Sequence, residues 1–186
     1  MPGSQFAYTT ALVKPGACTQ KDIDAMAAYV KGLPDGKPDM TAWMATVSAT
    51  CAACAFTDNA GAAWGPVLTK SGAFAGQNYG GCVEVASNNA ACGKAWQQLN
   101  ECILSVCHTC PQTDVDACET AAAAKGGPCD AEGTALATGC GSNGQAYITA
   151  CDPGTGHYPF ESGVKMQCVT GGSGATDGGT DAAGGG

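Results

Sequence analysis

The chain has 186 residues, enough for one domain with a core of its own. It carries 16 acidic and 8 basic residues, for a formal net charge of −8. The basic residues are scattered, so we expect no nucleic-acid partner, because phosphate binding requires clustered Lys and Arg. No stretch approaches the roughly 20 apolar residues of a membrane span, so we expect no transmembrane segment in this chain.

Large apolar side chains are scarce, whereas cysteine is abundant. Leu, Ile, Val and Phe together make up 23 of the 186 residues, and there are 13 cysteines. This share of large apolar residues is below the roughly 20% at which a charged chain is suspected of disorder. A disulfide stabilises a fold by about 2–4 kcal/mol, so several of them can replace a missing aliphatic core. We predict that disulfides hold the fold and that the protein works in an oxidising compartment.

The N-terminal stretch MPGSQFAYTTALVKPGAC has neither a basic region nor an apolar run of the kind that a signal peptide needs. We expect the chain to be a mature or trimmed form of an exported protein, located outside the cell or on its surface. A cytosolic protein is the alternative, and in that case the cysteines would favour metal binding.

The first predicted elements follow from breakers and caps. Residues 1–17 contain Pro and Gly without an apolar period, and they predict an extended N-terminal segment. Thr19 and Asp22 match a capping box, followed by apolar residues at helical spacing as far as Gly32. This pattern predicts a short helix between Thr19 and Gly32.

A second helix is predicted from Asp39, which is a good N-cap. Its apolar positions follow one helical face through Met40, Trp43, Met44, Val47, Cys51 and Cys54. Residues 55–81 contain many Gly and Pro breakers, and they predict a long loop. We expect Trp64, Val67, Leu68 and Phe74 to pin this loop to the core.

The strongest predicted helix runs from about Asn89 to Cys107. Its inner face comprises Cys92, Ala95, Trp96, Leu99, Ile103, Val106 and Cys107, with Cys102 at the edge. Another helix, capped by Thr113 or Asp114, runs through Cys118 and stops at Gly126. These two helices should pack as an antiparallel hairpin because only a few residues join them.

The remainder of the chain is rich in glycine. It contains Cys129, Cys140, Cys151 and Cys168, and we expect short helices or a small hairpin held by cross-links. The fold class is therefore mainly α: a disulfide-stabilised helical domain of about four helices and long loops over residues 18–168. A flexible Gly/Asp/Thr tail of low complexity occupies residues 169–186.

Five cysteines, from Cys107 to Cys151, stand eleven residues apart. Eleven residues make three helical turns, but Gly and Pro interrupt the intervals, so one continuous helix is excluded. We assign no function to this spacing.

Two C-x-x-C pairs raise the question of redox chemistry, namely Cys51 with Cys54 and Cys107 with Cys110. A redox enzyme places its attacking cysteine at a helix N-terminus, where the thiolate is stabilised. Both pairs lie at the C-terminal ends of predicted helices. Inert cross-links are therefore the favoured interpretation, with a thiol-redox enzyme as an alternative.

Metal binding is a second alternative. Cys102, Cys107, Cys110 and His108 offer three sulfurs and a nitrogen for zinc, but a second C-x-x-C pair at matched spacing is missing. The cysteine count also resembles that of bacterial copper-storage proteins, although the chain has no C-x-x-x-C pair. We assign no metal ligand and no cofactor.

Hydrolysis is a third alternative, and it would need one of the two histidines, His108 or His157. No G-x-S-x-G motif is present, and Asp114 and Asp116 suit helix capping better than acid–base work. We assign no catalytic residue.

A disulfide framework remains. Because 13 is odd, six bridges leave one cysteine unpaired. We expect Cys102 or Cys107 to bond Cys118 across the helical hairpin, and Cys51 and Cys54 to reach Cys18 and Cys82. The disulfide candidates are Cys18, Cys51, Cys54, Cys82, Cys92, Cys102, Cys107, Cys110, Cys118, Cys129, Cys140, Cys151 and Cys168.

Four stretches carry a family resemblance: CAACAF (51–56), WGPVL (64–68), NYGGCV (78–83) and ECILSVCHTCP (101–111). In this order they resemble a family of uncharacterised, cysteine-rich secreted or lipid-anchored proteins of Gram-negative bacteria, over about residues 18–151. The resemblance implies export and a helical, cross-linked domain, and it implies no activity. We therefore expect a secreted, non-enzymatic structural or binding module, a cell-surface, adhesion or filament component that associates with protein or with itself.

Overall fold

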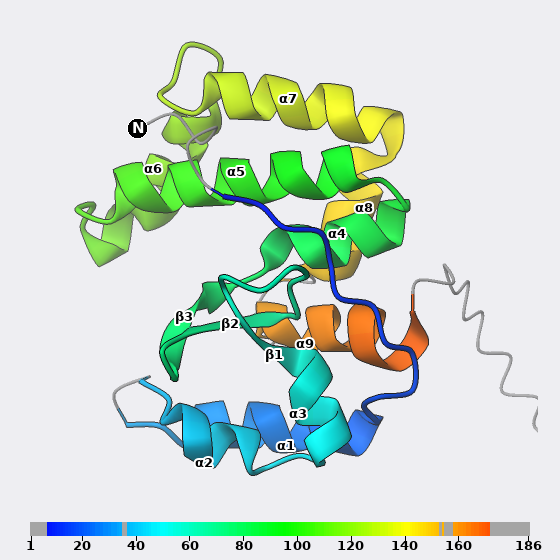
Figure 1. Ribbon diagram of the computed structural model, residues 1–186. Helices are drawn as coiled ribbons and strands as arrows, with labels where there is room; N and C mark the ends of the chain where they lie inside the picture. Colours follow the sequence, from blue (N-terminus) through cyan, green and yellow to red (C-terminus); the bar gives the residue numbers. More distant parts are fainter. Residues whose placement is uncertain (1–6, 35–36, 153, 155–157, 172–186) are drawn as a thin grey trace, which may run out of the picture.

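The computed structural model describes residues 7–34, 37–152, 154 and 158–171. It is mostly helical, with one small three-stranded sheet between two groups of helices (Figure 1). The predicted mainly α, disulfide-stabilised fold is confirmed at this level. The helices are more numerous than the four that were expected, and the sheet was not predicted, for reasons that lie in two segments described below.

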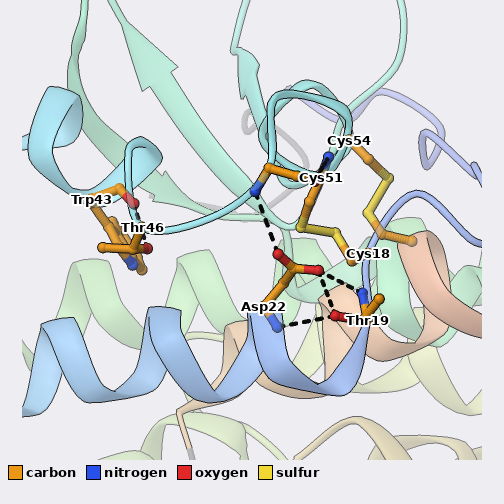
Figure 2. The surroundings of a disulfide bond; sticks show 9 residues. Cys18, Thr19, Asp22, Trp43, Thr46, Cys51 and Cys54 are labelled. Carbon is orange, nitrogen blue, oxygen red and sulfur yellow. Dashed lines mark hydrogen bonds between the residues drawn. A yellow bond between two sulfur atoms is a disulfide. The ribbon is translucent and has the colours of Figure 1, made fainter.

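The first helix confirms its prediction. Helix α1 spans Gln20–Lys31, and Thr19 and Asp22 form a complete capping box at its start. The Asp22 carboxylate accepts hydrogen bonds from the backbone N–H and the hydroxyl of Thr19, at 2.8 and 2.7 Å, and from the backbone N–H of Ser48. Figure 2 shows Asp22 beside Thr19, close to the Cys18–Cys51 disulfide. This carboxylate therefore ties the start of α1 to the start of α3.

The predicted second helix is two helices, α2 (Met40–Met44) and α3 (Ala49–Ala55). The apolar period runs across both, but Ser48 caps a new helix because its side chain accepts from the backbone N–H of Cys51. The break leaves Trp43 buried, with its indole N–H donating to the carbonyl of Met26 at 3.2 Å.

Residues 55–81 do not form the predicted long loop. They contain β1 (Phe56–Asp58), β2 (Val67–Lys70) and β3 (Ala73–Gln77), with β1 parallel and β3 antiparallel to β2. The two residues between β2 and β3, Ser71 and Gly72, have φ values of 53° and 79°. Positive φ at both positions matches the twist of a tight hairpin, so the glycine-rich stretch makes a turn instead of a loop.

The sheet is followed by two closely packed helices, α4 (Tyr79–Ser87) and α5 (Ala90–Cys107). Helix α5 confirms its prediction, including the Asn89 cap, whereas α4 was not predicted. Gly80 and Gly93 face each other where the helices meet, and a Cβ atom on Gly93 would lie only 2.5 Å from the carbonyl oxygen of Gly80. The missing side chains allow the two backbones to touch.

The chain after α5 forms short helices, which is one of the two structures expected for residues 129–168. These are α6 (Val115–Ala123), α7 (Asp130–Cys140), α8 (Gly144–Cys151) and α9 (Pro159–Val164), which continues into the π-helical segment η4 (Lys165–Thr170). Short 3₁₀ turns, η2 (Gln112–Asp114) and η3 (Gly141–Asn143), precede α6 and α8. Helix α6 runs back along α5, because Cys118 lies beside Cys107 and Cys129 is bonded to Cys102. The predicted tail begins within η4, and its residues from 172 onward lie outside the described residues.

The segment before α1 crosses the whole molecule (Figure 1). Tyr8 donates its hydroxyl to the Glu84 carboxylate of α4, at 2.5 Å, and Ala11 forms an isolated bridge with Trp64. Further along, the backbone N–H groups of Lys14 and Cys18 donate to the carbonyls of Gln167 and Cys168. Residues 7–18 therefore contact both α4 and the C-terminal segment η4.

None of the helices within the described ranges combines the length and the apolar character needed to cross a bilayer.

Candidate functional site

Sulfur forms much of the interior. Ten of the thirteen cysteines are buried, and the exceptions are Cys110, Cys118 and Cys140. Each of the three clusters of buried apolar residues contains cysteines of at least one disulfide. The molecule therefore has a core in which covalent bonds compensate for the scarcity of large aliphatic side chains.

Six disulfides form, and four of them are nested. We call these four disulfides the disulfide ladder. From the outermost pair inward, they are Cys82–Cys151, Cys92–Cys140, Cys102–Cys129 and Cys110–Cys118. The first cysteine of each pair lies further along the chain from one disulfide to the next, in α4, in α5 and just after α5. The second cysteine of each pair lies earlier each time, from Cys151 at the end of α8 back to Cys118 in α6. The ladder therefore fastens α6, α7 and α8 along the α4–α5 pair.

The ladder contains four of the five cysteines that stand eleven residues apart. Cys118, Cys129, Cys140 and Cys151 form one side of it, and their partners on the other side stand eight or ten residues apart. Only the eleven-residue interval is close to a whole number of helical turns, because eight and ten residues each miss a whole number by about 80°. The even spacing of Cys118, Cys129, Cys140 and Cys151 therefore marks these four as a set in the sequence, and it does not fix their partners. Cys107, the remaining member of the series, is left outside the ladder.

The local pairings expected from the sequence are partly corrected. Cys18 is bonded to Cys51, as expected, but Cys54 is bonded to Cys168 instead of Cys82. The segment after α9 returns to α3, which brings Cys168 within reach. Cys118 is bonded to Cys110, and neither Cys102 nor Cys107 is its partner.

The unpaired cysteine lies against a disulfide. Cys107 is the last residue of α5, it is 7% exposed, and its thiol is free. Its Sγ atom is 2.7 Å from Sγ of Cys118, and the sulfurs of Cys107, Cys110 and Cys118 all lie within 4.8 Å of one another. We call these three residues the three-sulfur cluster, and it is the candidate functional site.

The surroundings keep the free thiol protonated. Burial raises the pKa of Cys107 above its ordinary value, and the negative charge of Glu119 on α6 raises it further. The position at the C-terminal end of α5 acts in the same direction, because the helix dipole is negative there. At neutral pH Cys107 is therefore a thiol and not a thiolate.

The residues that were considered as zinc ligands do not come together as a set. Cys102 is bonded to Cys129, and His108 is exposed, with Nδ1 located 2.7 Å from the carbonyl oxygen of Ser105. The three-sulfur cluster has a spacing suited to soft metal ions such as Cu(I). Two of its sulfurs are joined to each other, so it offers three thiolates only after Cys110–Cys118 is reduced.

The two C-x-x-C pairs differ from redox motifs. Cys51 and Cys54 bond separate partners, and Cys107 is not bonded to Cys110. Neither pair is therefore a disulfide that could cycle within its own motif. Of the four cysteines, Cys51, Cys54 and Cys110 lie in cross-links as expected, whereas Cys107 is free.

Among the described residues, the hydrolytic candidates considered from the sequence have only local contacts. His157 lies outside the described residues. Asp116 is exposed, and Asp114 precedes α6 without a side-chain capping hydrogen bond, its carboxylate accepting from the hydroxyl of Thr113. The capping role expected for Asp114 is therefore wrong.

Buried polar groups elsewhere serve the packing of α4. Asn78 accepts from the backbone N–H of Gly81, and Gln97 accepts from that of Gly80, each at 2.9 Å. Gln97 also donates to Glu101, whose carboxyl pKa burial raises. These side chains satisfy N–H groups that the first turn of a helix leaves without partners, so they have a structural role.

Comparisons of the chain with models of protein families, with curated proteins and with solved structures found no match.

Proposed function

We propose that the protein is an exported, non-enzymatic module whose disulfide-bonded helical fold serves as a structural or binding component of the cell surface. One observation carries this proposal: six disulfides engage twelve of the thirteen cysteines and connect positions up to 114 residues apart. Disulfides persist in oxidising surroundings and are rare in reducing ones. A chain with so few large aliphatic residues depends on them.

The character of the surface supports the same role. Charged residues make up only 13% of the chain, and the net charge is −8, which suits a soluble surface that does not bind nucleic acid. The large exposed apolar residues Val13, Met44, Phe74 and Leu104 come from different elements.

The proposal is tested by producing the chain both in a bacterial periplasm and in a reducing cytoplasm. We expect the periplasmic protein to unfold cooperatively and to contain less than one metal ion per chain by elemental analysis. We expect the cytoplasmic protein to be unstable until it is oxidised. A cytoplasmic protein that is equally stable with its thiols reduced would contradict the proposal.

Thiolate metal binding is a second candidate function, favoured by the three sulfurs within 4.8 Å. It requires that Cys110–Cys118 be reduced while the buried disulfides stay intact. After mild reduction, one Cu(I) per chain should bind, and the Cys107→Ser variant should lose this binding. Wild-type protein that takes up no Cu(I) under these conditions would exclude the candidate.

A further inference from the structure

We propose that the three-sulfur cluster is an exchangeable disulfide with two alternative pairings, Cys110–Cys118 and Cys107–Cys118, and that exchange transfers the free thiol from Cys107 to Cys110. This inference does not depend on the proposed function, because it concerns chemistry within one chain.

The geometry places the reacting atoms together. The Cys107 and Cys118 sulfurs are 2.7 Å apart, which is closer than the roughly 3.5–4.0 Å at which even two smaller carbon atoms pack. Cys107 ends α5 and Cys118 lies in α6, and the packing of these two helices holds both sulfurs in place. Cys107 therefore needs no large movement to reach the disulfide.

The reaction is balanced within the protein. The Cys107 thiol loses its proton to solvent, and the thiolate attacks Sγ of Cys118. The new Cys107–Cys118 bond forms as the Cys110–Cys118 bond breaks, and Cys110 leaves as a thiolate that takes up a proton. One disulfide and one thiol exist before and after, so no oxidant or reductant is consumed.

The fold tolerates either pairing. Cys102–Cys129 fastens α5 to the start of α7, and the apolar cluster that contains Leu99 and Ala122 holds α5 against α6, both without help from Cys110. The two alternative bonds span 8 and 11 residues, so they restrict the unfolded chain to nearly the same extent. Neither pairing is therefore strongly favoured by chain entropy.

The two pairings differ in what they expose. All thirteen cysteines lie among the described residues, and Cys110–Cys118 is the one disulfide of the six in which neither residue is buried. Cys107 is buried, whereas Cys110 follows α5 and is half-buried. Exchange thus converts an inaccessible thiol into one that can meet an external disulfide or an alkylating reagent.

The test is to find which cysteine reacts in the native protein. The protein is incubated with N-ethylmaleimide at about pH 8.5, the ordinary pKa of a cysteine thiol, and acid then stops exchange. Peptic digestion without reductant is followed by mass spectrometry. We expect the label on Cys110 together with a Cys107–Cys118 cross-linked peptide. Label on Cys107 with Cys110–Cys118 intact, or no label after a day, would overturn the proposal.

Three variants sharpen the test. Cys107→Ser should retain Cys110–Cys118 and lose labelling to background, because nothing attacks the disulfide. Cys110→Ser should form Cys107–Cys118 and expose no thiol; two free thiols in that variant would contradict the proposal. His108→Ala is the matched control, since it alters the same turn but keeps all three sulfurs, and its label should remain on Cys110. The melting temperature of each variant shows whether it is folded.

Discussion

Asp22 shows how a single carboxylate contributes to this fold. The pKa of Asp22 is below its ordinary value, mainly because its carboxylate accepts a hydrogen bond from the side chain of Thr19. Asp22→Ala should lower the free energy of unfolding by about 1 kcal/mol at pH 7, a typical value for the loss of a helix cap. Because the pKa is lowered in the folded state, the contribution is fully present above about pH 3.9 and is lost as the pH falls through the folded value.

Thermal unfolding at pH 7 and in acid checks this prediction. Asp24→Ala is the control, because Asp24 lies on the same helix and accepts only an exposed hydrogen bond from Gln20 in the contacts that we describe. It should change stability by less than about 0.5 kcal/mol. An Asp22→Ala deficit that persists unchanged in strong acid would contradict the role of the charged carboxylate.

The contribution of Tyr8 to stability should depend on pH in the opposite sense to that of Asp22. Burial, then the hydrogen bond to Glu84, then the negative charge of Glu84 raise the pKa of Tyr8. The stability that neutral Tyr8 contributes is present below about pH 10, where the unfolded tyrosine begins to ionise, and is lost as the pH rises further. On a Cys107→Ser background, the deficit of Tyr8→Phe in urea unfolding should therefore shrink between pH 9 and 11, values that bracket the ordinary pKa of about 10.

Tyr29→Phe is the matched control for this experiment. The Tyr29 hydroxyl donates to the backbone carbonyl of Asp39 and not to a carboxylate, so Tyr29→Phe measures the loss of a tyrosine hydroxyl without a negatively charged partner. A deficit for Tyr8→Phe that does not change over this pH range would show that the hydroxyl is not protected in the folded state.

At the scale of elements, the contact between α4 and α5 depends on the absence of a side chain. A Cβ atom at Gly93 would meet Gly80, Glu84 and Tyr8 at 2.5–2.7 Å. Gly93→Ala should therefore destabilise the protein by about 1–3 kcal/mol through overpacking, despite the better helix propensity of alanine. Thermal unfolding measures this change.

Gly133→Ala in α7 is the matched control. There the nearest atom to the new Cβ would be 3.7 Å away, an ordinary contact. The same substitution should then stabilise the protein by roughly 0.5–1 kcal/mol, because only the propensity changes. Equal effects at both glycines would contradict the close approach of α4 and α5.

Helices with local signals were predictable, and elements that depend on distant contacts were not. Thr19 and Asn89 cap helices from within their own segments, so α1 and α5 follow from the sequence. The strands are short and pair with one another across a turn, and Phe74 remains 42% exposed, so no clear alternation marks the sheet. The break between α2 and α3 was hidden because the apolar period continues through the Ser48 cap.

The three-sulfur cluster was only partly predictable. An odd cysteine follows from counting, but the number of ways to pair thirteen cysteines is on the order of 10⁵. Cys107 and Cys110 share one predicted helix end, yet only the packing of α6 decides which of them bonds Cys118.

For the whole molecule, the disulfides should contribute unequally. Cys54–Cys168 is fully buried and connects residues 114 apart, whereas Cys110–Cys118 is partly exposed and spans only 8. Replacing Cys54 and Cys168 by alanine should lower the free energy of unfolding by about 3–5 kcal/mol, and replacing Cys110 and Cys118 by no more than about 2–3 kcal/mol. Denaturant unfolding of both double variants checks this order, and a reversed order would contradict it.

The most direct measurement for the account is a disulfide map of oxidised protein, obtained by digestion and mass spectrometry without reductant after acid quenching. We predict Cys18–Cys51, Cys54–Cys168 and the nested ladder, with one thiol that is shared between Cys107 and Cys110. Bridges that cross one another, or a majority of cysteines recovered as free thiols in folded protein, would contradict it.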